Sequence, residues 1–198
     1  MQWLFETKKR DTKLPQLIRA AVKLFVEQGI DATTTKQIAE AADVAEGTLY
    51  RHFRSKEEMA STVFLTHLEA FSRELDKAAA PLSNTKDKIR ALIQCYFAFF
   101  ESERILFEYI LATEHRELKK YPVTFRQPLH VLMDILEQGV SKGDIPEQDL
   151  TLSAAYIIGM VSRVSIFRSY GRIQESLIHN IDQVTEACWK VISGNTTK

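Results

Sequence analysis

Residues that interrupt helices are scarce in this chain, which has only seven glycines and five prolines among 198 residues. Apolar residues recur at intervals of three and four along most of its length, whereas the strict alternation of a half-buried strand is almost absent. Repeats and low-complexity segments are absent as well. These patterns predict an all-α protein of about nine helices.

Cysteine and long apolar runs are also nearly absent. Cys95 and Cys188 lie far apart in apolar helical patterns, which argues against a disulfide framework and favours buried thiols in a reducing compartment. Neither has a basic immediate neighbour, so a redox-sensing thiol is the less favoured alternative. The longest uninterrupted apolar run, residues 154–161, is far too short to cross a bilayer. The start MQWLFETKKRD is no signal peptide, so we expect a cytoplasmic protein without membrane contact.

An excess of either charge is missing too, because 26 basic residues balance 26 acidic ones. This balance argues against a protein that coats nucleic acid unspecifically. The charge is nevertheless uneven along the chain. Residues 1–56 hold ten Lys and Arg against seven Asp and Glu, and residues 57–198 hold sixteen against nineteen. A mildly basic first part is compatible with one end of the molecule facing phosphate.

Signatures of catalysis and metal binding are lacking as well. Neither the pair Glu114-His115 nor the other histidines show metal-ligand spacing. A glycine-rich phosphate loop and a GxSxG elbow are also missing. A dispersed set of Ser, His and Asp stays open as an alternative, but we expect no enzyme, no cofactor and no metal.

The clearest positive signal is the stretch TTTKQIAEAADVAEGTLYRHFRSKEEM at residues 33–59. Thr34 with Gln37 three residues later is a capping box that starts one short helix. Asp43 follows at a turn, where a left-handed residue is needed and Asp is tolerated. A second short helix then carries Leu49 and Phe53 toward the core. Two short helices joined by a tight turn are typical of a helix-turn-helix motif.

Gly47 lies within the second short helix, where glycine costs about 1 kcal/mol relative to alanine. The residues on or near its outward side are Glu46, Gly47, Thr48, Tyr50, Arg51 and His52. A glycine among so many hydrogen-bond donors makes sense if another backbone must approach closely, as DNA would.

The chain resembles the DNA-binding domain of TetR-family transcriptional regulators in AAVKLFVEQGIDATTTKQIAEAADV followed by GTLYRHFRSKEEM. The similarity covers residues 14–59. It implies a helix-turn-helix DNA-binding domain at residues 1–56 and a larger helical ligand-binding and dimerisation domain at residues 57–198. It also implies a homodimer that binds a near-palindromic operator and leaves it when a small molecule enters the larger domain. Repression is the usual direction in this family, and activation stays open.

Three positions depart from the family pattern. Asp43 stands where glycine is frequent, and Ala45 stands where Ser or Thr would cap the helix, a contribution of about 1 kcal/mol. Glu46 places a negative charge near phosphate, although it could accept a hydrogen bond from cytosine. The operator sequence therefore stays open.

The resemblance assigns these residues to DNA: Thr35, Lys36, Gly47, Thr48, Tyr50, Arg51, His52 and Lys56. Thr35 and Lys36 start a helix, where hydroxyl, backbone N–H and ammonium groups can meet phosphate. Lys56 starts the fourth helix, where the dipole and the ammonium group both favour phosphate. Gly47 and Thr48 are expected against the major groove, with Thr48 bonding a base or packing its methyl group on thymine.

The remaining contacts carry alternatives. Tyr50 and His52 are similar to phosphate-contacting positions of the family, but Tyr50 could be a core aromatic and His52 a solvated surface residue. Arg51 either reads guanine or binds phosphate. Residues 8–10 are a candidate arm on the DNA backbone.

The C-terminal part predicts a dimer interface. Ala155, Gly159 and Ser162 form a small-residue stripe against which a partner helix can pack closely. A second stripe at coiled-coil-like spacing consists of Leu177, Ile181, Val184, Cys188, Val191 and Ile192. The resemblance favours a four-helix interface built from two copies of this helix pair, whose two-fold symmetry would match a palindrome.

Large apolar residues in the middle of the chain are either core or the wall of a ligand pocket. The pocket interpretation depends mainly on the resemblance, and an acyl chain or a lipophilic aromatic compound would suit such walls. The candidates are Tyr96, Phe99, Phe100, Phe107, Ile110, His115, Phe125, Leu129, Met133, Tyr156 and Met160.

Two other classes of protein remain possible. A lipid or drug carrier with this fold would bind DNA weakly and without sequence preference. An assembly protein would pack its helix-turn-helix on another protein, but the polar outward set lacks an apolar patch for this. In the favoured interpretation, ligand entry shifts the fourth helix, and the two recognition helices lose the spacing of successive major grooves, about 34 Å.

Overall fold

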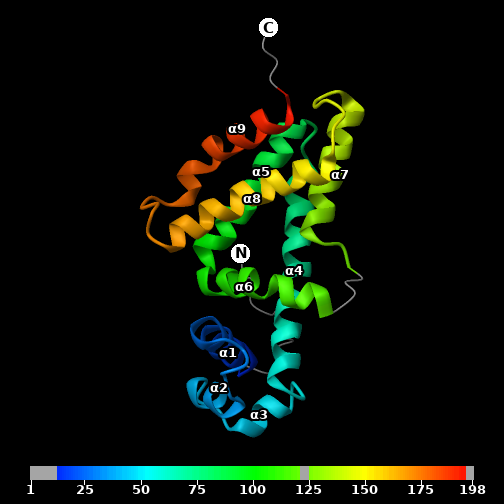
Figure 1. Ribbon diagram of the computed structural model, residues 1–198. Coiled ribbons are helices and arrows are strands. Elements are labelled where there is room, and N and C mark those ends of the chain that lie inside the picture. The colour runs from blue at the N-terminus through cyan, green and yellow to red at the C-terminus, as the bar shows by residue number, and fades with distance from the viewer. Residues whose placement is uncertain (1–12, 121–124, 195–198) are drawn as a thin grey trace. The chain divides into compact units, whose positions relative to one another are not determined.

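The computed structural model describes residues 13–120 and 125–194, apart from the side chains of residues 115–120. The described residues contain nine α-helices, one short 3-10 helix and no strand (Figure 1). The elements are α1 (Leu14–Gln28), α2 (Thr35–Ala41), α3 (Glu46–Tyr50), α4 (Lys56–Ala79), α5 (Thr85–Ser102), α6 (Arg104–Lys120), α7 (Pro128–Lys142), α8 (Leu150–Ser169), η1 (Leu177–Asn180) and α9 (Ile181–Ile192). The predicted all-α fold is confirmed.

The helices form two compact units. Among the described residues, one consists of residues 13–70 and 103–120, with α1, α2, α3, the first part of α4, and α6. The other consists of residues 71–102 and 125–194, with the rest of α4, α5 and α7 to α9. The functional boundary predicted between residues 56 and 57 falls inside the first unit and stays a prediction.

The core of the first unit is formed where α1 packs on α6. Leu17, Ile18 and Phe25 of α1 are buried, in line with its apolar stripe. The ring centroids of Phe25 and Tyr109 are 5.9 Å apart. The Tyr109 hydroxyl donates to the carbonyl of Ala60 at 2.7 Å. Through this hydrogen bond α6 is tied to the first half of α4.

The core of the second unit is formed where α5 packs against α9. The second half of α5 is apolar on all sides, so it needs cover from several helices. η1 lies at the end of this half, where the Leu177 backbone N–H donates to the Glu101 carboxylate at 2.7 Å. Helix α9 lies along the first half of α5, with the ion pairs Arg90–Asp182 and Lys86–Glu186. The buried residues of η1 and α9 are Leu177, Ile181, Val184, Cys188 and Ile192. The prediction that this stripe forms a dimer interface is therefore wrong, because the chain buries it internally and leaves only Val191 of the set exposed.

Both cysteines lie in this second unit, and burial raises the pKa of each thiol, that of Cys188 to about 11. At neutral pH the thiols are protonated and therefore poor nucleophiles. Cys188 is buried as predicted, whereas Cys95 is only partly buried. The raised pKa values support the interpretation of both cysteines as unreactive thiols.

Helix α8 has one buried face and one exposed apolar face. Ala154, Ile157 and Val161 are buried, whereas Leu152, Tyr156 and Phe167 on the opposite side are each 46–47% exposed. Within the described residues, α8 is the helix long and apolar enough to cross a membrane by length and composition, and 28% of its apolar window is buried. Its apolar run in the sequence is only residues 154–161, because Ser153 stands before this run and Ser162 and Arg163 follow it.

The contact between α5 and α7 requires a glycine. At the start of α5, the Thr85 backbone N–H and hydroxyl donate to the Asp144 carboxylate at 3.3 and 2.6 Å, which lowers the pKa of Asp144. Gly139 of α7 lies against the Thr85 side chain. A Cβ atom at Gly139 would lie 2.8 Å from Cγ2 of Thr85 and 3.2 Å from a side-chain carbon of Ile145.

Gly139→Ala is therefore expected to lower the free energy of unfolding by about 1–2 kcal/mol. Overpacking costs about 2–3 kcal/mol at so close an approach, the upper part of its usual range, and the better helix propensity of alanine returns about 1. Urea unfolding measures the change. The control is Gly47→Ala, where a Cβ meets no atom within 4 Å; this variant should be as stable as the wild type or more so. Equal stabilities of Gly139→Ala and wild type would contradict the contact.

Candidate nucleic-acid interface

The local geometry of α2 follows the sequence prediction. The Thr34 hydroxyl accepts a hydrogen bond from the Gln37 backbone N–H at 3.2 Å, and the Gln37 side chain accepts one from the Thr34 N–H at 2.9 Å. This capping box satisfies two donors at the start of a short helix. Asp43 has a φ of 52°, so it occupies the left-handed turn position as predicted. The turn directs the chain from α2 into α3.

Helix α3 presents a polar outer face. Its N-cap, Ala45, makes no side-chain capping bond, in line with the missing Ser or Thr. Leu49 is fully buried, while Glu46, Gly47, Tyr50 and Arg51 are exposed. With about 100° per residue, these four positions share one side of the helix. Tyr50 is 55% exposed, which excludes the alternative of a core aromatic.

Two residues expected on the outward side lie further inside. Thr48 is only 8% exposed, because it follows Gly47 by one helical step and shares the inner side with Leu49. The expectation that Thr48 faces outward is therefore wrong. His52 is half-buried, and its ring lies 6.3 Å from that of Phe53. A role of either side chain at DNA stays a prediction.

A polar cluster joins α2 to α3. The Thr35 hydroxyl donates to a Glu46 carboxylate oxygen at 2.6 Å and lies 3.3 Å from the Tyr50 hydroxyl. Two predicted phosphate contacts, Thr35 and Tyr50, are thus neighbours in space. Glu46, which departs from the family pattern in the sequence, accepts this hydrogen bond from the Thr35 hydroxyl. No sequence signal indicates this bond, since eleven residues and a turn separate its partners.

Beside this cluster lies a pocket of about 280 Å³ where the start of α2 meets the start of α4. It brings together three of the predicted DNA contacts, Thr35, Tyr50 and Lys56, and adds Arg54, which the sequence analysis missed. The position of Arg54 immediately before the Ser55 cap of a helix was an available signal. The lining residues are Thr33, Thr34, Thr35, Tyr50, Arg54, Ser55, Lys56 and Glu57.

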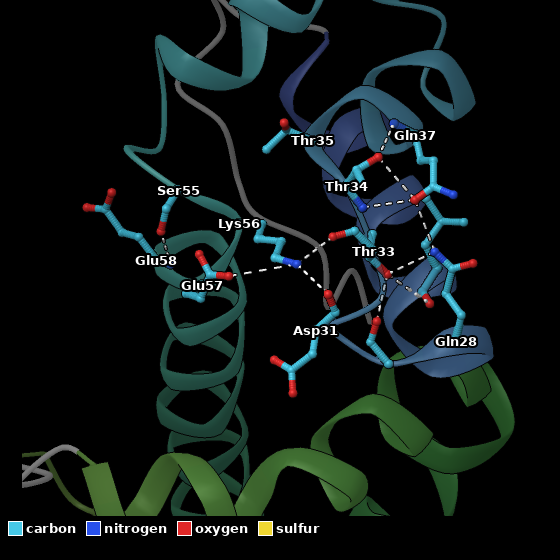
Figure 2. A network of polar contacts seen from close by, with 12 residues as sticks. Gln28, Asp31, Thr33, Thr34, Thr35, Gln37, Ser55, Lys56, Glu57 and Glu58 are labelled. Carbon is cyan, nitrogen blue, oxygen red and sulfur yellow. Dashed lines mark hydrogen bonds and ion pairs between the residues drawn. The ribbon is translucent and has the colours of Figure 1, made fainter.

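The two predicted lysine contacts differ in their surroundings. The Lys36 side chain is 77% exposed and pairs only loosely with Glu40, at 3.9 Å. The Lys56 ammonium group instead donates to the carbonyl oxygens of Asp31 and Thr33 (Figure 2). The expectation of an ammonium group directed at phosphate is therefore not met in this structure for Lys56. The candidate arm at residues 8–10 lies outside the described residues.

The predicted ligand-binding residues are distributed over both units. Phe99, Phe100 and Phe107 are buried; Tyr96, Ile110, Phe125, Met133 and Met160 are partly exposed; Leu129 and Tyr156 are exposed. Phe107, Ile110 and His115 belong to the first unit and the others to the second. The His115 side chain lies outside the described part of the chain. A shared pocket for this set stays a prediction.

In the part of the chain that the structure describes, no group of three or more His, Cys, Asp or Glu side chains is placed to hold a metal ion.

Comparisons with known proteins agree with this motif. Residues 17–63 match the family described as "Bacterial regulatory proteins, tetR family". The HTH-type transcriptional repressor KstR2 of Mycobacterium tuberculosis is 31% identical over 153 residues, covering 72% of this chain and 74% of that protein. The fatty acid metabolism regulator protein of Bacillus subtilis is 27% identical over 159 residues, covering 78% and 82%.

A solved structure shows the same fold. The transcriptional regulator FadR from Bacillus subtilis, in complex with stearoyl-CoA, superimposes with a TM-score of 0.71 at 24% identity, over 89% of this chain and 98% of that one. These relatives are all named as regulators, and KstR2 and FadR are named as regulators of transcription. The helix-turn-helix geometry, the family match and the extended similarity to KstR2 agree, and the chain belongs to the TetR family of bacterial transcriptional regulators.

Proposed function

We propose that this protein is a cytoplasmic, ligand-responsive repressor that binds a near-palindromic operator as a homodimer and is released by a small hydrophobic effector. The observation that carries the proposal is the exposed outer face of α3, formed by Glu46, Gly47, Tyr50 and Arg51, next to the Thr35 hydroxyl. A polar helix face with a glycine at its centre suits the major groove.

Each exposed group has a role in this proposal. Gly47 lets the α3 backbone approach the bases, and Arg51 reads guanine or binds phosphate. The hydroxyl oxygens of Thr35 and Tyr50 lie 3.3 Å apart, and both groups bind the DNA backbone. The ammonium group of the next residue, Lys36, adds a positive charge. Thr48 and His52 contribute from the edge of this surface through the parts of their side chains that remain accessible. Lys56 is the first residue of α4, and the positive end of this helix dipole attracts phosphate.

The exposed face of α8 is proposed as the dimer interface. Leu152, Tyr156 and Phe167 are large, apolar and exposed, and the exposed Gly159 between them offers a close approach. Stable interfaces bury roughly 800 Å² per partner, which a helix of this length can contribute to substantially. Arg163 is exposed on the same face. A membrane around α8 would have to accommodate this charge, whereas a partner chain can pair or solvate it.

The effector is proposed to carry an acyl chain. The fatty acid metabolism regulator and the FadR structure with stearoyl-CoA are relatives whose names point to this chemistry. The predicted pocket residues are mostly large and apolar, as an acyl chain requires. Because α4 runs from the first unit into the second, a shift of this helix on ligand entry can change the placement of α2 and α3.

The proposal is tested by selecting genomic fragments with the purified full chain, wild type beside Tyr50→Ala. We expect the wild type to recover one inverted repeat and the variant to recover none, because the exposed Tyr50 is proposed to bind the DNA backbone and is not needed in the core. Stearoyl-CoA should then lower the affinity for the recovered DNA. A folded, dimeric wild type that recovers nothing specific at physiological salt would favour the carrier interpretation.

A further inference from the structure

Lys56, the first residue of α4, has a side chain that is turned into the protein. Its Nζ donates to the carbonyl oxygens of Asp31 at 2.8 Å and Thr33 at 2.6 Å, and lies 3.9 Å from a Glu57 carboxylate oxygen (Figure 2). Only 20% of the side chain is exposed. Since an ammonium group has three donors, these partners use most of its hydrogen-bonding capacity.

The loop that Lys56 binds is also held from α1. Thr33 is fully buried, and its hydroxyl donates to the carbonyl of Gly29 at 2.7 Å and accepts from the Gln28 side chain at 3.2 Å. The next residue, Thr34, is the N-cap of α2. The Lys56 bond to the Thr33 carbonyl therefore acts one residue before the α2 N-cap, and it ties the first turn of α4 to that point.

Lys36 provides the contrast within the same unit. Its side chain is 77% exposed, and its nearest described partner, a Glu40 oxygen, is 3.9 Å away. An ammonium group in this position can reach a phosphate without breaking an internal hydrogen bond. The Lys56 group would first have to leave two carbonyl acceptors and expose them without a partner.

We propose that Lys56 is a positioning residue whose ammonium group sets the start of α2 relative to α4, and that phosphate binding is left to exposed groups such as Lys36. The inference depends on the proposed DNA-binding function and revises the role expected for this ammonium group. It also assigns a physical link to regulation. A displacement of the first turn of α4 would carry the α2 N-cap with it, and the Thr35–Glu46 bond would pass the displacement to α3.

The first test needs no DNA. Amide hydrogen exchange of the full chain is compared for wild type, Lys56→Met and Lys36→Met, with attention to Thr33, Thr34 and Gln37. Lys56→Met keeps most of the aliphatic stem and removes the donors, so these amides should exchange about tenfold faster. Lys36→Met should leave their rates unchanged. If Lys56→Met does not fold, Lys56→Gln, which keeps a donor, replaces it.

The second test uses a short mixed-sequence DNA duplex as the probe and measures affinity against salt concentration. Loss of a phosphate-bound ammonium group lowers the slope of log K against log salt by about 0.9. Lys36→Met should show this change. Lys56→Met should instead weaken binding about threefold to tenfold with the slope unchanged, because the start of α2 is displaced and no counterion contact is lost.

The two readouts separate the possible failures. Unchanged exchange rates together with a reduced slope for Lys56→Met would overturn the inference and make this ammonium group a phosphate ligand. A wild type that neither binds the duplex nor recovers an inverted repeat would refute the proposed function, and the exchange rates would still decide whether Lys56 holds the start of α2.

Discussion

Gly47→Leu is expected to weaken operator binding about hundredfold or more while leaving the chain at least as stable as the wild type. A Cβ at Gly47 meets no atom of the chain within 4 Å, so the fold itself does not require glycine here. Leucine is the better helix former by roughly 0.8 kcal/mol. At the DNA surface, however, extra bulk at a close contact costs about 1–3 kcal/mol in each of two half-sites.

The measurement is fluorescence anisotropy on the recovered operator, combined with urea unfolding of the free protein. Gly47→Ala serves as the matched control and should fall between wild type and Gly47→Leu in affinity, because it adds a single methyl group. An affinity of Gly47→Leu within twofold of the wild type would show that α3 does not approach DNA with this backbone segment.

Gly159→Arg is expected to convert the protein to monomers and to weaken operator binding about hundredfold. A Cβ at Gly159 also meets no atom within 4 Å, so a single chain tolerates a side chain at this position. In the proposed dimer, the new guanidinium would enter an apolar contact next to Arg163, one turn further along the helix. A monomer also loses the gain in effective concentration that comes from binding two half-sites together.

Sedimentation velocity distinguishes the two states directly. The matched control is Ala112→Arg, which adds the same charge to an exposed position on α6 and should leave the protein dimeric. If Gly159→Arg sediments as a dimer at micromolar concentration, α8 is not the interface. If both variants sediment as monomers, the added charge and not the α8 face is responsible.

The elements around α2 and α3 could be predicted because their signals are local. A capping box needs Thr34 and Gln37 three residues apart, and the turn needs one residue that tolerates a positive φ, here Asp43. Such signals act between near neighbours in the sequence. The helix-turn-helix and the outward placement of Tyr50 follow from them directly.

The wrong predictions concern choices that depend on partners distant in the sequence. From the sequence alone, the apolar stripe of α9 could pack against a second copy of the chain or against α5. The structure shows that it packs against α5 of the same chain. Thr48 lies at the boundary between the two faces of a five-residue helix, where a small rotation decides its exposure. Lys56 could reach phosphate or the loop carbonyls, and its position beside Asp31 and Thr33 emerges only on folding.

Hydroxyl-radical footprinting of the wild type on the recovered operator tests the central claim most directly. Two copies of α3 on successive major grooves predict two symmetric protected patches about 34 Å apart. Gly47→Leu should remove both patches at the same protein concentration. A single asymmetric patch, or a footprint that Gly47→Leu leaves unchanged, would contradict a homodimer that reads its operator through the outer face of α3.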